Sequence, residues 1–422
     1  MSRLDKFKGP LRLKNVTVPG CLLDRPQDLV VTDLSIDSGR IAARGGIDIE
    51  MNRAMVFPCF VDMHTHLDKG HIWPRAANPD GTFKGALDAV TADREANWSA
   101  EDVRARMEFA LKCAYAHGTK AIRTHIDSSP PQDDVSWPVF SEVRSDWKDR
   151  IELQASSLIG CESFDEIGTG YATTANTVAQ HGGVLGMVTY HVPDLRRRLL
   201  DFFELAGNRG LAVDFHADET LDQSSETLRM IAETALQIDW DGPVAVGHCC
   251  SLSLQQEQRA LETLDIVAKA GLNIVSLPMC NLYLQDRNSN RTPRARGVTL
   301  VHEMVARGIN VSFASDNTRD PFYAYGDLDM IEVMRQATRI GHLDHSRKDW
   351  TDAFTVNPAR ACGFTRPSLL PGAPADLVVV RARDWTELFA RPQADRMVIR
   401  AGDMIDTTLP DYSELDHLME PG

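Results

Sequence analysis

One stretch decides the fold: Val56-Phe57-Pro58-Cys59-Phe60-Val61-Asp62-Met63-His64-Thr65-His66. It is an apolar run that ends in two histidines separated by one residue. Because side chains alternate between the two faces of an extended strand, His64 and His66 point the same way at its carboxyl end. Two imidazoles placed in this way suit a divalent metal. The pair alone is a weak signal, and its weight depends on the rest of the chain.

Seven further apolar runs follow, and they alternate with amphipathic segments. We expect strands over residues 56–66, 119–127, 151–157, 186–191, 211–218, 243–249, 273–277 and 309–315. Between them, Ser99–His117 opens like a capping box and stops at Gly118, and Leu254–Ala270 stops at Gly271, as helices do. Strand–helix alternation repeated eight times predicts an α/β fold, a (β/α)8 TIM-type barrel over residues 56–365.

The two ends of the chain have a different pattern, with short strands separated by turns. These strands are expected at Leu11–Val18, Leu29–Ile36, Ala375–Val380 and Met397–Arg400. Neither end could bury a strand face alone. We therefore expect residues 1–55 and 366–422 to form one discontinuous small β-sandwich domain.

Composition excludes several classes of function. The chain has 422 residues, of which 43% are hydrophobic, and its 45 basic and 60 acidic residues give a net charge of −15. Such a charge disfavours nucleic acid and anionic membrane as partners. There is no apolar signal core, and no run approaches a membrane span. The eight cysteines lack a C-x-x-C pair or a disulfide-framework spacing, so we expect a protein of the reducing cytoplasm.

Polar residues gather at the carboxyl ends of the apolar runs: His64, His66, His125, Asp127, Tyr190, His191, His216, Glu219, His248, Asp316 and Asn317. In a barrel these ends meet at one mouth, where active sites lie. Polar groups at apolar strand ends are costly unless they pair or act. Taken singly, each residue can equally be a packing or turn residue. Their concurrence at several strand ends favours a functional site, although we expect His125 and Asp127 to be supporting or packing groups.

These segments resemble the amidohydrolase superfamily and, within it, the cytosine deaminase group. The matching stretches lie in the family's order at residues 60–68, 122–127, 215–219, 247–248 and 315–321, followed by 372–378. The resemblance implies one divalent transition metal, zinc or ferrous iron, held by His64, His66, His216 and Asp316. Binuclear members carry a lysine at the fourth strand tip, where this chain has Tyr190 and His191.

The resemblance also implies a reaction. A metal-bound hydroxide attacks an amidine carbon of a nitrogen heterocycle, and ammonia is released. Asp316 takes the proton of the water, and His248 hydrogen-bonds the hydroxide and then the tetrahedral centre. Glu219 protonates a ring nitrogen and passes a proton to the departing ammonia, which requires a pKa raised by burial.

The substrate side of the match is incomplete. Cytosine deaminases read the pyrimidine with a glutamine after the third strand, and Gln154 comes several residues too early for that role. Cytosine deaminases tend to carry a second aspartate at the position of Asn317. Related triazine hydrolases resemble the Ser315-Asp316-Asn317 version found here. We predict substrate contacts from Asn317, Phe322, Trp73 and Tyr190. A long loop, residues 69–83, is expected to cover the mouth, and the sequence leaves open whether it closes.

The hypothesis is therefore a metal-dependent hydrolytic deaminase of a small heterocyclic substrate. One alternative is a hydrolase of a cyclic amide, or of the C–N bond of an N-substituted amino-triazine or pyrimidine. A remote alternative is an inactive barrel that binds a ligand. The family resemblance implies a homo-oligomer. The heterocycle, the choice between zinc and iron and the number of subunits stay open at this point.

Overall fold

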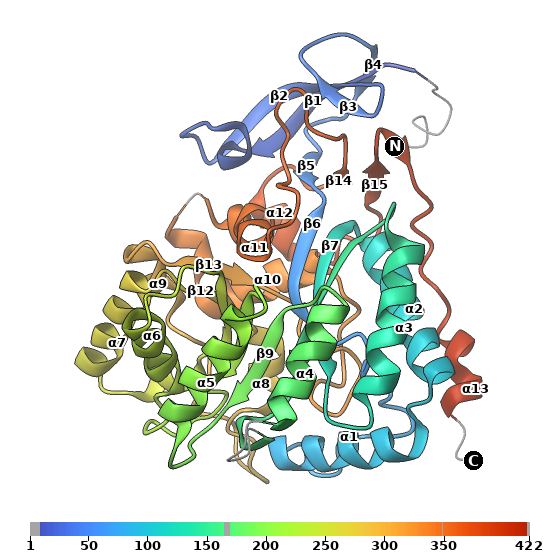
Figure 1. Ribbon diagram of the computed structural model, residues 1–422. Coiled ribbons are helices and arrows are strands. Elements are labelled where there is room, and N and C mark those ends of the chain that lie inside the picture. The colour runs from blue at the N-terminus through green and yellow to red at the C-terminus, as the bar shows by residue number, and fades with distance from the viewer. Residues whose placement is uncertain (1–8, 164–168, 348, 420–422) are drawn as a thin grey trace.

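The computed structural model describes residues 9–163, 169–347 and 349–419 (Figure 1). Eight parallel strands lie at its centre: β6 (Phe60–Thr65), β7 (Thr119–Asp127), β8 (Glu152–Leu158), β9 (Leu185–Thr189), β10 (Val213–Ala217), β11 (Val244–His248), β12 (Asn273–Ser276) and β13 (Asn310–Phe313). The expected strands are therefore present, with ends that differ by a few residues.

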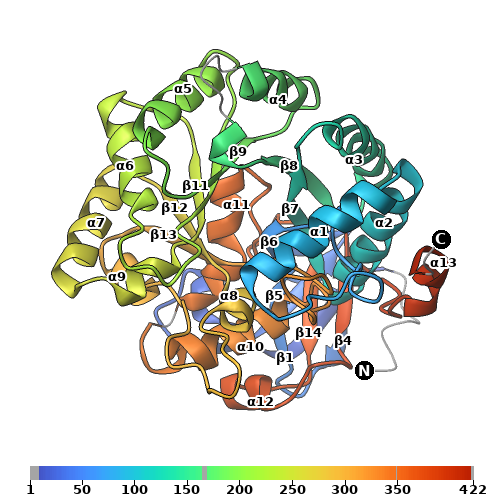
Figure 2. The same cartoon turned by 90° about the horizontal axis from the view of Figure 1, so that it is seen from below.

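The parallel strands follow one another in chain order. Strands β6 to β8 form one sheet and β9 to β13 a second. Isolated parallel bridges link the two sheets, from Ser156 to Val184 at one junction and from Thr65 to Asp316 at the other. Seen from the mouth, the helices surround the strands (Figure 2). The arrangement is an α/β fold of parallel sheets, consistent with a TIM-type barrel.

Helices connect the strands: α1 (Phe83–Asn97), α2 (Ala100–His117), α3 (Asp133–Trp147), α4 (Thr169–Gln180), α5 (Leu195–Gly207), α6 (Thr227–Gln237), α7 (Glu257–Lys269), α8 (Pro278–Leu284), α9 (Val301–Ala306), α10 (Met330–Gly341) and α11 (Val356–Cys362). The predicted start of α2 is confirmed, because Ser99 Oγ accepts a hydrogen bond from the Asp102 amide at 3.3 Å. Gly118 ends this helix with a φ of 92°, which favours glycine. Helix α7 begins later than expected because Cys250–Leu254 form a separate 3₁₀ turn.

The first apolar run forms two strands, not the single strand expected over residues 56–66. Strand β5 (Met55–Pro58) pairs with β14 (Leu377–Val380) in a different sheet, whereas β6 pairs with β7. The change falls at Cys59, whose amide donates to the Asp376 carbonyl at 2.9 Å. Both strands are buried, so one unbroken apolar run serves two sheets.

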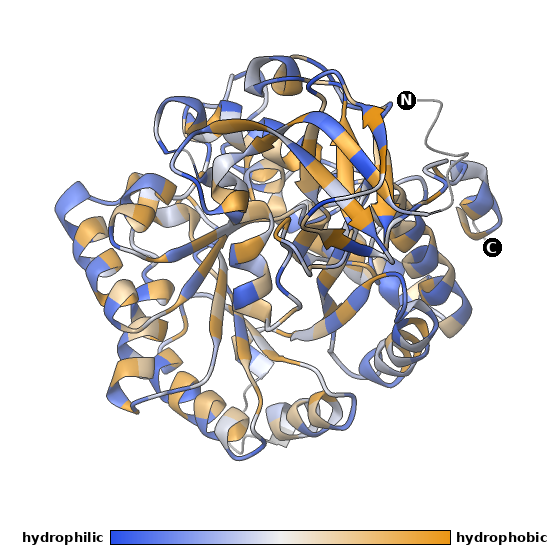
Figure 3. Ribbon diagram, turned by 90° about the horizontal axis from the view of Figure 1, so that it is seen from above, coloured by the Kyte–Doolittle hydropathy of each residue, from blue (hydrophilic) through white to orange (hydrophobic). Residues whose placement is uncertain are grey.

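The two ends of the chain meet in one eight-stranded sheet. Its path is β16-β15-β14-β5-β1-β2-β3, with β4 on β1. The remaining members are β1 (Leu11–Pro19), β2 (Leu29–Asp37), β3 (Arg40–Ala42), β4 (Ile47–Glu50), β15 (Met397–Arg400) and β16 (Asp403–Met404), and α12 (Trp385–Ala390) lies between β14 and β15. Figure 3 shows apolar residues concentrated on these strands and on the inner strands of the parallel sheets.

The last described residues leave this sheet. The 3₁₀ turn Tyr412–Leu415 and α13 (Asp416–Met419) return to α2, where Leu415 packs against Phe109 and Cys113. Elsewhere, short 3₁₀ turns occur at Gly20–Leu23, Cys161–Ser163, Leu343–His345 and Trp350–Phe354. Within the described ranges, no helix is long and apolar enough to cross a membrane.

Candidate metal centre and active site

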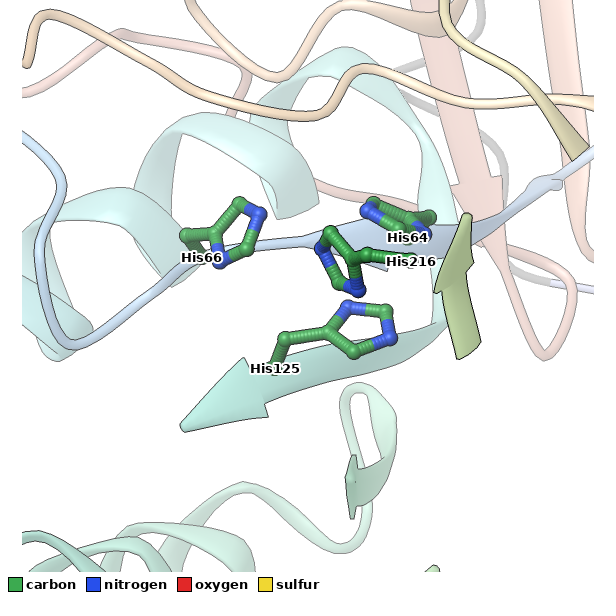
Figure 4. A group of neighbouring side chains, drawn as sticks. All are labelled: His64, His66, His125 and His216. Atoms are coloured by element: carbon green, nitrogen blue, oxygen red, sulfur yellow. The ribbon is translucent and has the colours of Figure 1, made fainter. Parts of the chain in front are cut away.

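Four predicted ligands converge at the carboxyl ends of three strands. His64 is on β6, His66 follows it, His216 is on β10, and Asp316 lies just beyond β13. The Nε2 atoms of His64 and His66 lie 3.5 and 3.2 Å from Asp316 Oδ1. The ring of His216 is centred 4.5 Å from that of His64, and Figure 4 shows the imidazoles around one small space. The structure thus brings these side chains together as the sequence predicts.

Backbone contacts hold two of these groups in register. The Asp316 amide donates to the His64 carbonyl at 2.9 Å, and Thr65 Oγ1 donates to the Asp316 carbonyl at 2.8 Å. Asp316 adopts a left-handed φ of 63°, a conformation uncommon for residues other than glycine. Gly247 leaves room for the cluster, because a Cβ there would lie 2.8 Å from His64 Cε1.

The unsatisfied atoms of this cluster fit a metal ion. Both nitrogens of His64, Nδ1 of His66, Nε2 of His216 and Oδ2 of Asp316 are buried without a hydrogen-bond partner. Buried polar atoms are normally paired, so an unpaired group of this size needs an explanation. Donors around a tetrahedral ion with bonds of about 2.0 Å lie roughly 3.3 Å apart. The spacings of 3.2 and 3.5 Å to Asp316 match that value.

The imidazoles are held in the neutral form that binds metals. Burial lowers the pKa of His64, His66 and His216 well below 6.5. The nearby Lys69 charge adds to this effect on His66, and the electrostatic effect of the neighbouring His125 adds to it on His216. Since metal ligands must be deprotonated, the site does not have to lose imidazole protons to bind an ion.

His125 on β7 lies directly beside the metal cluster. Its ring is centred 4.0 Å from that of His64, and the four histidines form one group whose donor atoms lie within 4.8 Å of one another. Behind it, Asp214 Oδ1 lies 3.3 Å from His125 Nε2, and Asp214 Oδ2 accepts from Arg123 at 2.8 Å. Gln154, the displaced glutamine, accepts from Arg123 at 2.7 Å and serves this network.

Glu219 and His248 flank the cluster. Glu219 Oε1 lies 3.4 Å from His248 Nδ1, and their side chains are 14% and 1% exposed. Burial, and next the Asp316 charge, raise the pKa of Glu219 well above its usual value. A carboxyl in such surroundings can carry a proton at neutral pH and act as a general acid. Burial lowers the pKa of His248 to about 3, so its ring is neutral.

Comparison with known proteins gives one family. The amidohydrolase family profile matches residues 122–406. The chain belongs to the amidohydrolase family. It is 52% identical to a pterin deaminase of Rhizobium rhizogenes over 95% of this chain and 94% of that one. It is therefore a hydrolytic enzyme that acts on C–N bonds, and members of its family use a divalent metal.

Solved amidohydrolases have the same fold. The structure superposes on a 5-methylcytosine deaminase from Klebsiella pneumoniae with a TM-score of 0.81 and 25% identity, over 95% of this chain and 98% of that one. An N-isopropylammelide isopropylaminohydrolase from Burkholderia multivorans gives a TM-score of 0.73 and 24% identity, over 94% and 98%. The predicted superfamily and its cytosine deaminase-like group are confirmed.

The four residues predicted to contact the substrate differ from one another in burial and in the groups they contact in this amidohydrolase. Phe322 is 9% exposed, and its ring packs edge-on against Phe83 of α1 at 5.4 Å. Asn317 donates to Asp320 at 2.8 Å and accepts from the Cys280 thiol at 3.5 Å. The half-buried Trp73 donates its amide to the Arg319 carbonyl. Tyr190 is 41% exposed and contacts Glu162.

Sequence reasoning missed two residues of the site. Lys69 is only 4% exposed, and its ammonium lies 3.6 Å from Asp127 and 5.5 Å from the centre of the Phe322 ring. Asn281 on α8 contacts both Glu219 and His248. The position of Lys69, three residues after His66 in the sequence, could have indicated that it lies near the site. Asn281 follows β12, whose end carries none of the predicted site residues, so its sequence position alone gave no hint.

Proposed function

We propose that this amidohydrolase hydrolyses the 2-amino group of a pterin, releasing ammonia and leaving an oxo group on the ring. The enzyme is a hydrolytic deaminase of a nitrogen heterocycle. The observation that carries the proposal is the largely buried Glu219 carboxyl, with its raised pKa, beside the unsatisfied His64, His66, His216 and Asp316 cluster. The choice of a pterin among heterocycles follows from the 52% identity to a pterin deaminase.

His64, His66, His216 and Asp316 would hold the metal in this proposal. The ion, zinc or ferrous iron, would make a water molecule nucleophilic near neutral pH. Asp316 would accept the proton of that water at Oδ2, which has no partner among the described residues. The water oxygen bonds to the ring carbon that carries the amino group.

Glu219 would supply the proton that this addition needs. Its carboxyl would protonate a ring nitrogen of the substrate, so that negative charge does not build up on the heterocycle. Glu219 would then take the proton of the added hydroxyl and pass it to the amino group, so that the C–N bond breaks and ammonia leaves. The proton on Asp316 would return to Glu219. The added oxygen remains on the ring as a carbonyl, so one water is consumed for each ammonia released.

Lys69 would read the oxo group that pterins carry beside the reacting amidine. Within the described residues its ammonium has no hydrogen-bond partner, although it is almost fully buried. A buried cation with unused donors needs acceptors. Phe322 would pack against the flat bicycle. An adenine nucleoside lacks such an oxo group, so this donor favours the pterin over that substrate.

The remaining predictions belong to the same proposal. We propose contacts from Asn317, Trp73 and Tyr190 to the substrate, and a (β/α)8 barrel of residues 56–365 with a small β-sandwich of 1–55 and 366–422. All eight cysteines are free, which supports a reducing cytoplasm. We also propose that the protein assembles into a symmetric homo-oligomer.

The test is release of ammonia, or of isopropylamine from N-isopropylammelide, by metal-loaded enzyme on a substrate panel. Pterin, cytosine, an adenine nucleoside and N-isopropylammelide are compared by kcat/KM. The proposal expects the highest value for pterin, with oxygen from labelled water in the product. Highest turnover of cytosine, or release of isopropylamine without deamination of pterin, would reject it.

A paired test addresses the oxo group. Lys69→Met is expected to raise KM for pterin about tenfold, the effect of losing about 1.4 kcal/mol of binding from a hydrogen bond to a charged donor. KM for 2,4-diaminopteridine, which lacks the acceptor, should change much less. Lys120→Met is the control, because Lys120 is also a buried lysine beside an aspartate, Asp376 at 3.5 Å, but it lies at the amino end of β7, away from the mouth. Equal effects of Lys69→Met on both substrates would contradict this role.

A further inference from the structure

Asn281 bridges the two residues that flank the metal cluster. It lies on α8, is 2% exposed, and its Nδ2 donates to Glu219 Oε1 at 3.3 Å. The same nitrogen lies 3.1 Å from His248 Nδ1. An amide nitrogen carries two hydrogens, so both contacts can be made at once. Glu219 and His248 are thus connected through one side chain.

The orientation of this amide follows from its two neighbours. The Glu219 oxygen accepts hydrogen bonds when the carboxyl is ionised, and it must pass through that state whenever it gives up a proton. An amide oxygen at the same place would then face a carboxylate oxygen. The nitrogen suits both charge states of Glu219. It also lies nearer to His248 Nδ1, at 3.1 Å, than Glu219 Oε1 does, at 3.4 Å, so Nδ1 accepts from the Asn281 amide.

The second nitrogen of His248 then has a defined role. A neutral imidazole has one acceptor and one donor nitrogen, so an accepting Nδ1 places the hydrogen on Nε2. Nε2 is buried without a partner among the described residues. A ring nitrogen of His248 lies within 4.8 Å of donor atoms of both His64 and Asp316. The Nε2–H group is therefore a free donor beside the reacting centre.

We propose that Asn281 is a positioning residue that fixes His248 as the neutral Nε2–H tautomer and holds Glu219 next to it. His248 then donates a hydrogen bond to the oxygen that adds to the ring carbon, and it does not take the proton of the water. That proton goes to Asp316, and the Glu219 proton goes to the ring nitrogen. The inference rests on the proposed deamination.

Helix α8 is built to carry this side chain. It begins at Pro278, two residues after the end of β12, and it lies at one side of the mouth, next to α10 (Figure 2). Gln285, at the other end of α8, donates to the Glu219 backbone carbonyl at 3.4 Å. Cys280 donates to Asn317. Three side chains of one short segment thus contact the segments that carry Glu219, His248 and Asp316.

The kinetic test uses an isosteric change in the metal-loaded enzyme. Asn281→Asp can accept but cannot donate while ionised, so it would move the imidazole hydrogen to Nδ1. We expect kcat on pterin to fall about 10- to 100-fold, as supporting partners of a metal site typically show, with KM within about twofold. In Asn281→Ala, which adds no charge, kcat should fall by a similar factor. An Asp variant with the kcat of the wild type would overturn the proposal.

Two comparisons separate this role from a structural one. Asn273→Asp is the control, because Asn273 is on β12 and donates to the Val244 carbonyl at 3.0 Å, at the other end of the strands. It should keep the wild-type kcat. In a His248→Gln background, Asn281→Ala should cost less than in the wild type, since part of its effect passes through His248. An undiminished cost there would contradict the coupling.

A spectroscopic measurement reads the tautomer directly. In zinc-loaded protein with ¹⁵N-labelled histidine, the His248 signals are identified by their loss in His248→Gln. We expect the hydrogen on Nε2 in the wild type and on Nδ1 in Asn281→Asp, and a wild-type hydrogen on Nδ1 would overturn the inference. An enzyme that shows the expected tautomer but no pterin deamination would reject the proposed function alone.

Discussion

Two buried groups of charged and polar side chains lie close together in this protein, and they differ in how their hydrogen bonds are used. In the arginine–aspartate cluster of Arg75, Asp93, Asp102 and Arg106, every carboxylate oxygen accepts at least one hydrogen bond. Arg75 alone binds both aspartates and the Leu418 carbonyl. In the metal cluster of His64, His66, His216 and Asp316, donor atoms are left without partners.

The difference separates structure from chemistry. The arginine–aspartate cluster joins the loop over residues 69–83 to α1, α2 and the returning end of the chain, and its interactions are complete without a ligand. The metal cluster is just as buried but incomplete, so it is organised for something that binds. Several unsatisfied buried donor atoms gathered at one point, more than the mere presence of charged residues, therefore mark the site.

Loss of a proposed metal ligand should have the largest effect. His216→Ala removes one of the three imidazoles, and we expect metal content well below one ion per chain. Because a metal contributes several kcal/mol to such a transition state, kcat should fall by at least about 10³-fold. Elemental analysis and ammonia release measure both. The control is His181→Ala, since His181 pairs with Ser141 at 2.7 Å outside the site; unchanged metal content in His216→Ala would be inconsistent with the ligand set.

Glu219→Gln tests the acid within the incomplete group. The amide keeps the shape but cannot supply the proton, so kcat should fall about 10²- to 10⁴-fold while one metal per chain remains bound. Steady-state kinetics and metal analysis distinguish this from collapse of the site. Glu226→Gln is the matched control, because Glu226 pairs with Arg259 at 2.6 Å away from the metal cluster. Full activity of Glu219→Gln would exclude the proton-donor role.

Arg75→Met tests the complete group. It leaves Asp93 and Asp102 without their shared cation, and removing one partner of a buried pair costs about 3–5 kcal/mol of unfolding free energy. Urea unfolding measures the loss. Lys84→Met, which breaks a Lys84–Asp88 pair whose side chains are 81% and 62% exposed, should cost less than about 1 kcal/mol. Equal losses of unfolding free energy in the two variants would show that the arginine–aspartate cluster does not stabilise the fold to this extent.

His71 sharpens the comparison, because its nitrogens are also buried and unpaired although it lies outside the metal cluster. Burial lowers its pKa from 6.5 to about 3. Below pH 6.5 the His71 ring therefore binds a proton in the unfolded chain but stays neutral in the folded protein. Stability from the neutral ring is complete above pH 6.5 and is lost as the pH falls towards 3, by up to about 1.4 kcal/mol per pH unit.

The measurement is urea unfolding of His71→Asn and the wild type between pH 7.5 and 4.5. Asparagine does not titrate and tolerates the left-handed φ of 66° at this position. The variant should gain stability relative to the wild type as the pH falls. Parallel profiles for the two proteins would mean that burial of this ring does not couple folding to protonation.

Much of the site could be predicted because parallel strands impose a simple rule. Residues at strand ends share one edge, so the polar residues there could be grouped without coordinates. The family resemblance then indicated His64, His66, His216 and Asp316 as the ligands. The rule fails where a helix delivers the side chain, as α8 delivers Asn281. It also fails at Cys59, because an apolar run looks the same whether it serves one sheet or two. The direction of the Lys69 side chain depends on loop packing that periodicity does not describe.

Anomalous scattering from crystals of the metal-loaded enzyme, recorded at the zinc and iron edges, gives the most direct test. We expect one peak about 2.0–2.2 Å from donor atoms of His64, His66, His216 and Asp316. No peak, two peaks, or a single ion coordinated by His125 in place of Asp316 would contradict the account.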